Sequence, residues 1–151
     1  MTDDLIARLE RLEHIERARA VQACYADIID QWDIDRLGEV FAGDAVLAAS
    51  NRRFEGLDAI RGFYRDVHSS DPSRRRHFIT NVAVVAANAH EVTLAASFIY
   101  VAGTDGESSL GWGRYRDTFR RVGDDVLMTG KDITVGYRGP VSASWGAALL
   151  G

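Results

Sequence analysis

The spacing of the apolar residues changes once along this chain, and that change constrains the fold more than any other feature. Up to about residue 68, apolar side chains recur every three to four residues, which predicts helices. After Pro72 they alternate with polar side chains and β-branched residues dominate, which predicts strands. Helices that come first and hairpin-linked strands that follow are typical of an α+β domain with a largely antiparallel sheet.

Three helices and one short strand are expected before Pro72. The first helix has a charged, amphipathic first half and an apolar second half, so its second half should enter the core. The second helix should begin at Asp33 or Asp35 and end at Gly43, by the usual capping preferences. The expected segments are a helix over 4–32, a short helix ending at 43, a strand over 45–49, a turn over 51–53 and a helix over 57–68.

Four long strands are expected after Pro72, separated by turn-forming residues. Long strands twist, so the sheet should curve and hold the helices on its concave face. We expect the tail over 138–151, with Trp145 and two leucines, to cover an edge, pack on a partner or be disordered. The expected strands cover 76–86, 91–101, 110–121 and 126–137.

Composition indicates one ordinary globular domain over residues 1–151, with its core at about 5–137. The chain is 46% apolar, and its net charge of −4 provides no basic face for nucleic acid. Its one cysteine, Cys24, cannot form an internal disulfide. The acidic N-terminus lacks the features of a signal peptide, and no apolar run is long enough to cross a membrane. We therefore expect a cytoplasmic protein.

Asp30 is the first residue whose position is unfavourable for its side chain. It lies near the end of the first helix, in the apolar half, where the helix dipole disfavours a carboxylate by about 0.3–1 kcal/mol. A buried carboxylate would also need a partner. Asp30 either faces water and ends the helix, or it marks a functional site.

His77 is the second such residue. Alternation places His77, Ile79 and Asn81 on one face of the strand over 76–86, and Phe78 and Thr80 on the other. A histidine on a partly apolar face is either a core residue with its hydrogen bonds satisfied or a catalytic base.

Several short motifs, in this order and spacing, resemble the SnoaL-like polyketide cyclase/dehydratase family of the nuclear transport factor 2-like superfamily. The resemblance covers residues 5–137. The motifs are CYADIIDQWD at 24–33, FAGDAV at 41–46, GLDAI at 56–60, HFITN at 77–81 and GRYRD at 113–117.

The resemblance implies a cone-shaped α+β barrel, in which three N-terminal helices pack on a strongly curved, mixed, largely antiparallel sheet. In catalytic members, such as scytalone dehydratase, a His–Asp dyad lies inside the cone. His77 and Asp30 match that dyad, and Tyr25 matches a tyrosine that often assists it. The resemblance also implies a homodimer, which agrees with the apolar character of both faces of the strand over 76–86.

The matched residues suit proton transfer next to a carbonyl group. Such a reaction needs a base that titrates near neutrality, and imidazole is the natural choice. Asp30 would orient the imidazole and stabilise the imidazolium, and Tyr25 could donate to a carbonyl oxygen or a leaving hydroxyl. Returning the proton to a leaving hydroxide gives dehydration, and returning it to carbon gives isomerisation.

Three further residues are candidates for binding the substrate: Asn81, Tyr115 and Arg116. Asn81 shares the predicted face of His77, although a hydrogen bond within the protein is the simpler interpretation. Tyr115 and Asp117 alternate onto one face of their strand, and Arg114 and Arg116 onto the other, so only one set can reach a cavity. For Lys131 too, the sequence does not decide between a side chain that reaches the cavity and an exposed charge.

The sequence therefore predicts a cofactor-independent lyase, most simply a dehydratase, that acts on a hydrophobic alicyclic or polycyclic small molecule. It contains no zinc motif, phosphate-binding loop or nucleophile elbow, so we expect neither metal nor cofactor. An isomerase or cyclase would use the same residues. A non-catalytic role, as a ligand-binding module or a dioxygenase β-subunit-like protein, is the alternative of a different class.

Overall fold

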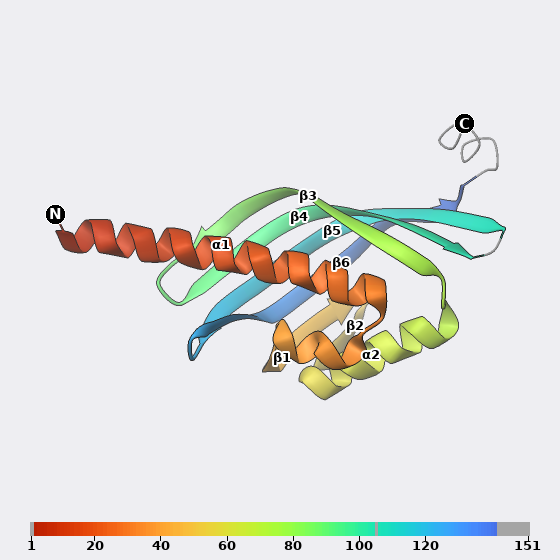
Figure 1. Ribbon diagram of the computed structural model, residues 1–151, viewed down its shortest axis with the longest axis horizontal. Helices are drawn as coiled ribbons and strands as arrows, with labels where there is room; N and C mark the ends of the chain where they lie inside the picture. Colours follow the sequence, from red (N-terminus) through yellow and green to blue (C-terminus); the bar gives the residue numbers. More distant parts are fainter. Residues whose placement is uncertain (1, 105, 142–151) are drawn as a thin grey trace.

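The computed structural model describes residues 2–104 and 106–141, in which helices come first and long strands follow (Figure 1). Along the chain the elements are α1 (Thr2–Gln31), the 3-10 helix η1 (Ile34–Glu39), β1 (Phe41–Ala49), β2 (Arg52–Glu55), α2 (Leu57–Ser70), β3 (Arg74–Ala87), β4 (Glu91–Thr104), β5 (Glu107–Val122) and β6 (Asp125–Pro140).

The strands form one six-stranded sheet in the order β2-β1-β6-β5-β4-β3. β1 and β6 are parallel, and every other neighbouring pair is antiparallel. The sheet is not closed, and its edge strands are β2 and β3. This arrangement confirms the predicted α+β class with a mixed, largely antiparallel sheet.

Helix α1 lies across one face of the curved sheet and packs against β3, β4 and β6 (Figure 1). Its second half supplies Ile28 and Ile29 to the core, as the apolar pattern predicted, whereas Leu5 and Leu9 in its first half stay exposed. Helix α2 buries Ile60 and Tyr64 and packs against β1. The core therefore lies between the helices and one face of the sheet.

The expected second helix is wrong in type and length. It is a 3-10 helix that ends at Glu39, and Gly43 lies inside β1 rather than at a helix end. β1 begins at Phe41 because its pairing with β6 buries Phe41 and Ala42, and because the Met128 amide donates to the Val40 carbonyl at 2.7 Å. Pairing with a distant strand thus overrides the local stop signal.

A hairpin replaces the simple turn expected over 51–53. Ser50 and Asn51 both have positive φ values, 52° and 61°, as a two-residue hairpin turn requires. The chain then enters β2 directly at Arg52, which pairs with Ala49.

The alternation predicted for β3 is wrong beyond Thr80, because the strand contains a bulge. The register with β4 shifts between Thr80 and Ala83, and Asn81 has a φ of 53°. One extra residue in a strand reverses the faces that follow it. Val82 therefore packs on the core side, and Asn81 is exposed instead of sharing the face of His77.

The expected tail over 138–151 is partly strand, since β6 extends to Pro140. Residues 142–151, which include Trp145, lie outside the described residues, so the predicted roles of the tail stay predictions. Within the described part of the chain, no helix is both long and apolar enough to cross a membrane.

Candidate active site

The structure brings Asp30 and His77 into direct contact, although 47 residues separate them. His77 Nδ1 lies 2.6 Å from Asp30 Oδ1, and the backbone N–H of His77 donates to both carboxylate oxygens at 3.1 and 2.9 Å. The two side chains are only 9% and 7% exposed. Helix α1 and strand β3 thus meet at a buried carboxylate that accepts from both the ring and the backbone of one residue.

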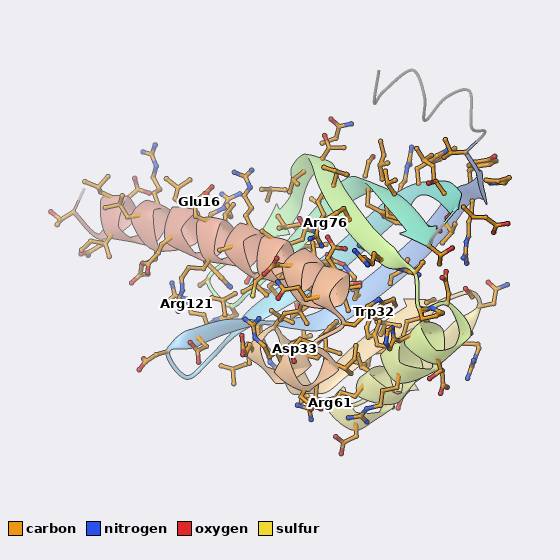
Figure 2. All side chains as sticks on the ribbon, turned by 45° about the vertical axis from the view of Figure 1, so that its right-hand side comes forward. Glu16, Trp32, Asp33, Arg61, Arg76 and Arg121 are labelled. Atoms are coloured by element: carbon orange, nitrogen blue, oxygen red, sulfur yellow. The ribbon has the colours of Figure 1, made fainter. Side chains whose placement is uncertain are left out.

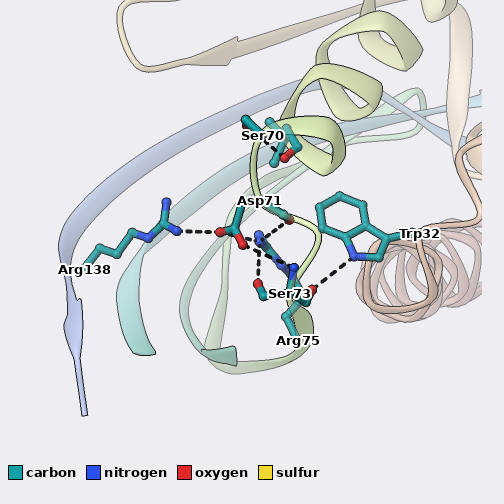
Figure 3. Close-up of polar contacts among 7 residues, drawn as sticks. Trp32, Ser70, Asp71, Ser73, Arg75 and Arg138 are labelled. Carbon is teal, nitrogen blue, oxygen red and sulfur yellow. Dashed lines mark hydrogen bonds and ion pairs between the residues drawn. The ribbon is translucent and has the colours of Figure 1, made fainter. Parts of the chain in front are cut away.

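The end of α1 fixes where this carboxylate lies. Trp32 has a φ of 57°, its amide donates to Ile29, and the Asp33 amide donates to Ile28, which is the hydrogen-bond pattern of a Schellman closure. Glycine usually occupies the left-handed position, so a tryptophan there is strained. Figure 2 shows Trp32 at the end of α1. Its indole N–H donates to the Ser73 carbonyl at 3.3 Å, which ties the helix end to the start of β3 (Figure 3).

Aromatic rings line the core face of the sheet beside the dyad. The His77 ring lies 5.4 Å from the Tyr100 ring and 6.3 Å from the Phe98 ring, and Phe98 stacks on Tyr115 at 4.3 Å. Gly111 and Gly113 on β5 leave room for Tyr100 and Phe98, since a Cβ at either glycine would clash with those rings. The dyad therefore borders a wall of flat apolar rings.

Tyr25 belongs to this wall but its hydroxyl is engaged elsewhere. It is 2% exposed, and its hydroxyl lies 2.7 Å from that of Tyr64. Its ring meets Tyr115 edge to face at 6.0 Å. Burial, followed by the neighbouring tyrosines, raises the pKa of Tyr25 well above its usual value. Tyr25 thus stays a neutral phenol that supports the wall.

Beneath the tyrosines lies a buried ion pair that sequence reasoning left open. Lys131 Nζ donates to both carboxylate oxygens of Asp117 at 3.0 Å, and both side chains are 0% exposed. Gln22 donates to the same carboxylate at 2.8 Å. The ammonium lies 3.6 Å from the Tyr115 ring centre and 4.0 Å from that of Tyr25. Burial lowers the pKa of Lys131, and the charge of Asp117 opposes this change.

A surface depression of about 640 Å³ lies on the same side of the sheet, at the strand ends. Ser73, Ala102 and Arg138 contribute to its lining. Arg75 follows Ser73 on β3 and Tyr100 precedes Ala102 on β4, both at alternate positions toward the dyad. Arg75 and Tyr100 therefore lie between the depression and His77.

An ion-pair network holds Arg75 in this position. Figure 3 shows Asp71 between Arg75 and Arg138, with Trp32 beside Arg75. Arg75 Nη2 lies 2.9 Å from an Asp71 carboxylate oxygen, and the guanidinium carbon lies 4.7 Å from the Trp32 ring centre. Burial would raise the pKa of Asp71, but the hydrogen bonds from Ser73 and the two guanidinium groups hold it below its usual value.

The remaining candidates lie apart from this site. Asn81 is exposed at the bulge, where the Thr80 hydroxyl is 3.5 Å from its side-chain oxygen. Arg116 is exposed on the face of β5 opposite to Tyr115. Asp30, His77 and Tyr115 are brought together and Tyr25 adjoins them, whereas Asn81 and Arg116 are not. In the described ranges, no group of three or more histidine, cysteine or acidic residues is arranged to hold a metal ion.

The sequence analysis missed two parts of the site, although one of them gave a signal. Alternation had placed Asp117 on the face of Tyr115, and a short hairpin between β5 and β6 would pair it with Lys131, as the structure does. Arg75 gave no such signal, because it lies within a run of three arginines that reads as an exposed loop.

Comparison with known proteins now adds to this geometry. A family model described as SnoaL-like domain matches residues 10–130. No match was found among the curated proteins.

Three solved structures cover most of the chain. A candidate aromatic ring hydroxylase from Novosphingobium aromaticivorans is 25% identical, with a TM-score of 0.75 and coverage of 86% of this chain and 94% of that one. A candidate scytalone dehydratase from the same organism is 16% identical, with a TM-score of 0.76 and coverage of 95% and 93%. A hexachlorocyclohexane dehydrochlorinase, LinA-type3, from Novosphingobium barchaimii is 15% identical, with a TM-score of 0.79 and coverage of 90% and 95%. The last two show similarity of fold alone.

Proposed function

Since the chain belongs to the SnoaL-like domain family and has the nuclear transport factor 2-like fold, we propose that it is a cofactor-independent lyase with His77 as its general base and acid. A candidate scytalone dehydratase and a hexachlorocyclohexane dehydrochlorinase are among the proteins of similar structure. The observation that carries the proposal is the 2.6 Å contact between His77 Nδ1 and Asp30 Oδ1 in a nearly buried site.

The contact assigns different roles to the two ring nitrogens. When Nδ1–H donates to Asp30, Nε2 carries the lone pair and acts as the base. The carboxylate holds the ring in this tautomer and stabilises the imidazolium that forms. The backbone N–H of His77 donates to the same carboxylate, which keeps Asp30 in place while the ring charges and discharges.

The reaction then proceeds by two proton transfers on one histidine. Nε2 removes a proton from a carbon next to a carbonyl, and the electron pair moves into the carbonyl to form an enolate. The imidazolium next protonates the hydroxyl on the neighbouring carbon as its bond breaks, so that water leaves and a double bond forms. Transfer of the proton back to a different carbon would instead give isomerisation, and an internal carbon electrophile would give cyclisation.

The lining of the site supports a hydrophobic substrate. Phe98, Tyr100 and Tyr115 present ring surfaces next to the dyad, and flat apolar walls favour alicyclic or polycyclic rings. In this proposal Tyr25 and Tyr115 shape the wall. Tyr25 is not assigned the donor role expected from the sequence, because its hydroxyl already bonds to Tyr64.

Turnover of a hydroxylated alicyclic ketone library, with products identified by mass spectrometry, tests this function. A general base contributes roughly 100- to 10,000-fold to the rate, so His77→Ala should lose activity by that factor. Asp30→Asn should lose most of the activity, although the amide oxygen of the new side chain can still accept a hydrogen bond from the backbone N–H of His77. His90→Ala, an exposed histidine on a turn, is the matched control. Full activity in His77→Ala would refute the proposal.

A non-catalytic role as a ligand-binding or dioxygenase β-subunit-like protein is the second candidate. Three depressions formed by residues of the described ranges are lined by other side chains, and neither His77 nor Asp30 lines any of the three. The absence of both dyad residues from the lining of these three depressions is the observation that favours this role. Tight binding of an alicyclic ketone with no product over days would support it.

We also propose that the protein is a homodimer through the outer face of its sheet, the face opposite to α1. Phe78, Ile99, Trp112 and Tyr137 are direct neighbours across four strands and form one row. They are 57%, 40%, 49% and 49% exposed. Half-exposed side chains of this size leave on the order of 300 Å² of apolar surface, about the size of the largest apolar patch on a typical monomer, and such a patch is often functional.

A second copy suits this row because the surface beside it carries both charge signs. Arg116 and Asp132 are paired neighbours on the outer face, so a two-fold axis can place opposite charges together around an apolar centre. A stable interface needs about 800 Å² per partner, so the dimer would bury the charged rim together with the row.

Light scattering tests the dimer. Trp112→Glu should yield a folded monomer, whereas Val122→Glu, at an exposed apolar position near a strand end, should leave the dimer intact. A wild-type monomer at high concentration would refute this arrangement. The cytoplasmic location expected from the sequence stays a prediction.

A further inference from the structure

Arg75 has one guanidinium nitrogen that is fully engaged and one N–H group without a partner. Its Nη2 contacts the Asp71 carboxylate, the Asp71 carbonyl and the Ser73 hydroxyl. Its Nε, by contrast, is buried without a hydrogen-bond partner among the residues that the structure describes. The side chain is only 9% exposed, so bulk water does not satisfy this donor. An unpaired buried N–H costs about 1–3 kcal/mol, and such a group calls for an explanation.

The unpaired donor lies next to the dyad. Arg75 and His77 are two residues apart on one face of β3, and both border the ring of Tyr100. The guanidinium carbon of Arg75 lies 5.7 Å from the Tyr100 ring centre, and the ring of His77 lies 5.4 Å from it. The depression of about 640 Å³ begins at the next positions, Ser73 and Ala102. Along β3, Arg75 therefore lies between the depression and His77.

The network around Arg75 keeps a positive charge available. Asp71 is the single carboxylate that pairs with both Arg75 and Arg138. Two guanidinium groups and one carboxylate leave a net charge of +1. The other cation near the dyad, Lys131, is fully committed to Asp117, and the hydroxyl of Tyr25 is bonded to Tyr64.

We propose that Arg75 is a substrate-binding residue whose Nε–H receives the substrate oxygen that becomes negative when His77 removes the proton. This inference rests on the proposed function and narrows its substrate class to compounds whose acidic C–H is adjacent to a carbonyl or a similar oxygen acceptor. A charged donor placed where charge develops stabilises the transition state more than the ground state. The Trp32 and Tyr100 rings flank the guanidinium, and access of an oxygen to the buried Nε needs a local displacement of the groups that cover it.

Para-nitrophenol is a probe that needs no knowledge of the substrate. Its phenolate resembles an enolate oxygen on a flat ring, and its colour reports ionisation. The wild type should bind the phenolate at least tenfold more tightly than the phenol, so that the bound probe ionises at lower pH than the free probe. Arg75→Met should abolish this preference. Arg76→Met, which changes a neighbouring arginine that is exposed, should retain most of it.

Several outcomes would overturn the assignment. They are the absence of probe binding to the wild type, equal binding of phenol and phenolate, and an Arg75→Met variant that retains the preference. If Arg75→Met does not fold, Arg75→Lys keeps the charge but loses the Nε donor, and it should weaken phenolate binding at least threefold.

The same probe separates this inference from the proposed function. His77→Ala should still prefer the phenolate while it loses turnover. If no ketone is ever turned over but the preference depends on Arg75, the proposed function fails and only the binding of an anionic oxygen by Arg75 stands. If ketones are turned over equally well by Arg75→Met and the wild type, the assignment of Arg75 fails alone.

Discussion

Replacing Lys131 by methionine would test how the buried ion pair supports the site. Methionine keeps the length and apolar stem of lysine, so the substitution removes the charge with little change in packing. Asp117, which is 0% exposed, would lose the ammonium group that pairs with it and keep the hydrogen bond from Gln22. Leaving one charge of a buried pair unpaired costs about 3–5 kcal/mol.

The cation–π contacts add to this cost. The ammonium lies within 4.0 Å of two ring centres, and a desolvated contact of this kind contributes about 2 kcal/mol. The expected loss in the free energy of unfolding is therefore at least about 3 kcal/mol, a large part of the stability of an ordinary domain. Urea unfolding followed by far-ultraviolet circular dichroism measures it.

A double variant, Lys131→Met with Asp117→Leu, separates charge from packing. Removing both charges of a buried pair is often neutral or stabilising, but Gln22 would lose its acceptor at a cost of about 1–3 kcal/mol. The double variant should thus be more stable than Lys131→Met alone by about 2 kcal/mol. The reasoning is refuted if the single variant loses less than about 1 kcal/mol, or if the double variant is the less stable of the two.

Three further predictions concern single positions. Burial lowers the pKa of His14 from its usual value of 6.5. Near and below that pH the unfolded chain therefore binds more protons than the folded chain, and the free energy of unfolding should fall as the pH decreases. In His14→Leu, the urea midpoint of unfolding should depend less on pH in this range. Gly113→Ala places a Cβ 2.2 Å from the Thr134 carbonyl oxygen and should cost at least about 1–3 kcal/mol in urea unfolding. Trp32→Gly should be more stable than Trp32→Ala by about 1 kcal/mol, because glycine accepts the φ of 57°, and equal melting temperatures would contradict this.

The fold was largely predictable because its two periodicities are long and uninterrupted. The four long strands lie within a few residues of their expected bounds, and α1 ends one residue before the expected position. The errors fall where a local signal competes with distant pairing. Gly43 reads as a helix stop, yet β1 passes through it because β6 supplies a parallel partner. β2 has only four residues, too few to show alternation.

The site was predictable only in part, for a related reason. Alternation assigns Tyr115 correctly to the core face, and it fails at Asn81 because a bulge is a backbone event that no side-chain pattern records. The contact between Asp30 and His77 joins two elements that no local rule connects, and the resemblance to a family indicated it. Arg75 escaped notice because its burial depends on Trp32, which comes from another element.

The position of Asp30 explains why fold and proposed chemistry are difficult to separate at this site. A carboxylate near the end of α1 faces the negative pole of the helix dipole, which disfavours its charge. The backbone N–H of His77 offsets this by donating to both oxygens, so strand β3 acts as a partner for the helix end. One of these two oxygens, Oδ1, also holds the imidazole. Because an asparagine oxygen can still accept from the backbone but cannot stabilise an imidazolium, Asp30→Asn divides the two roles, whereas Asp30→Ala would remove both together.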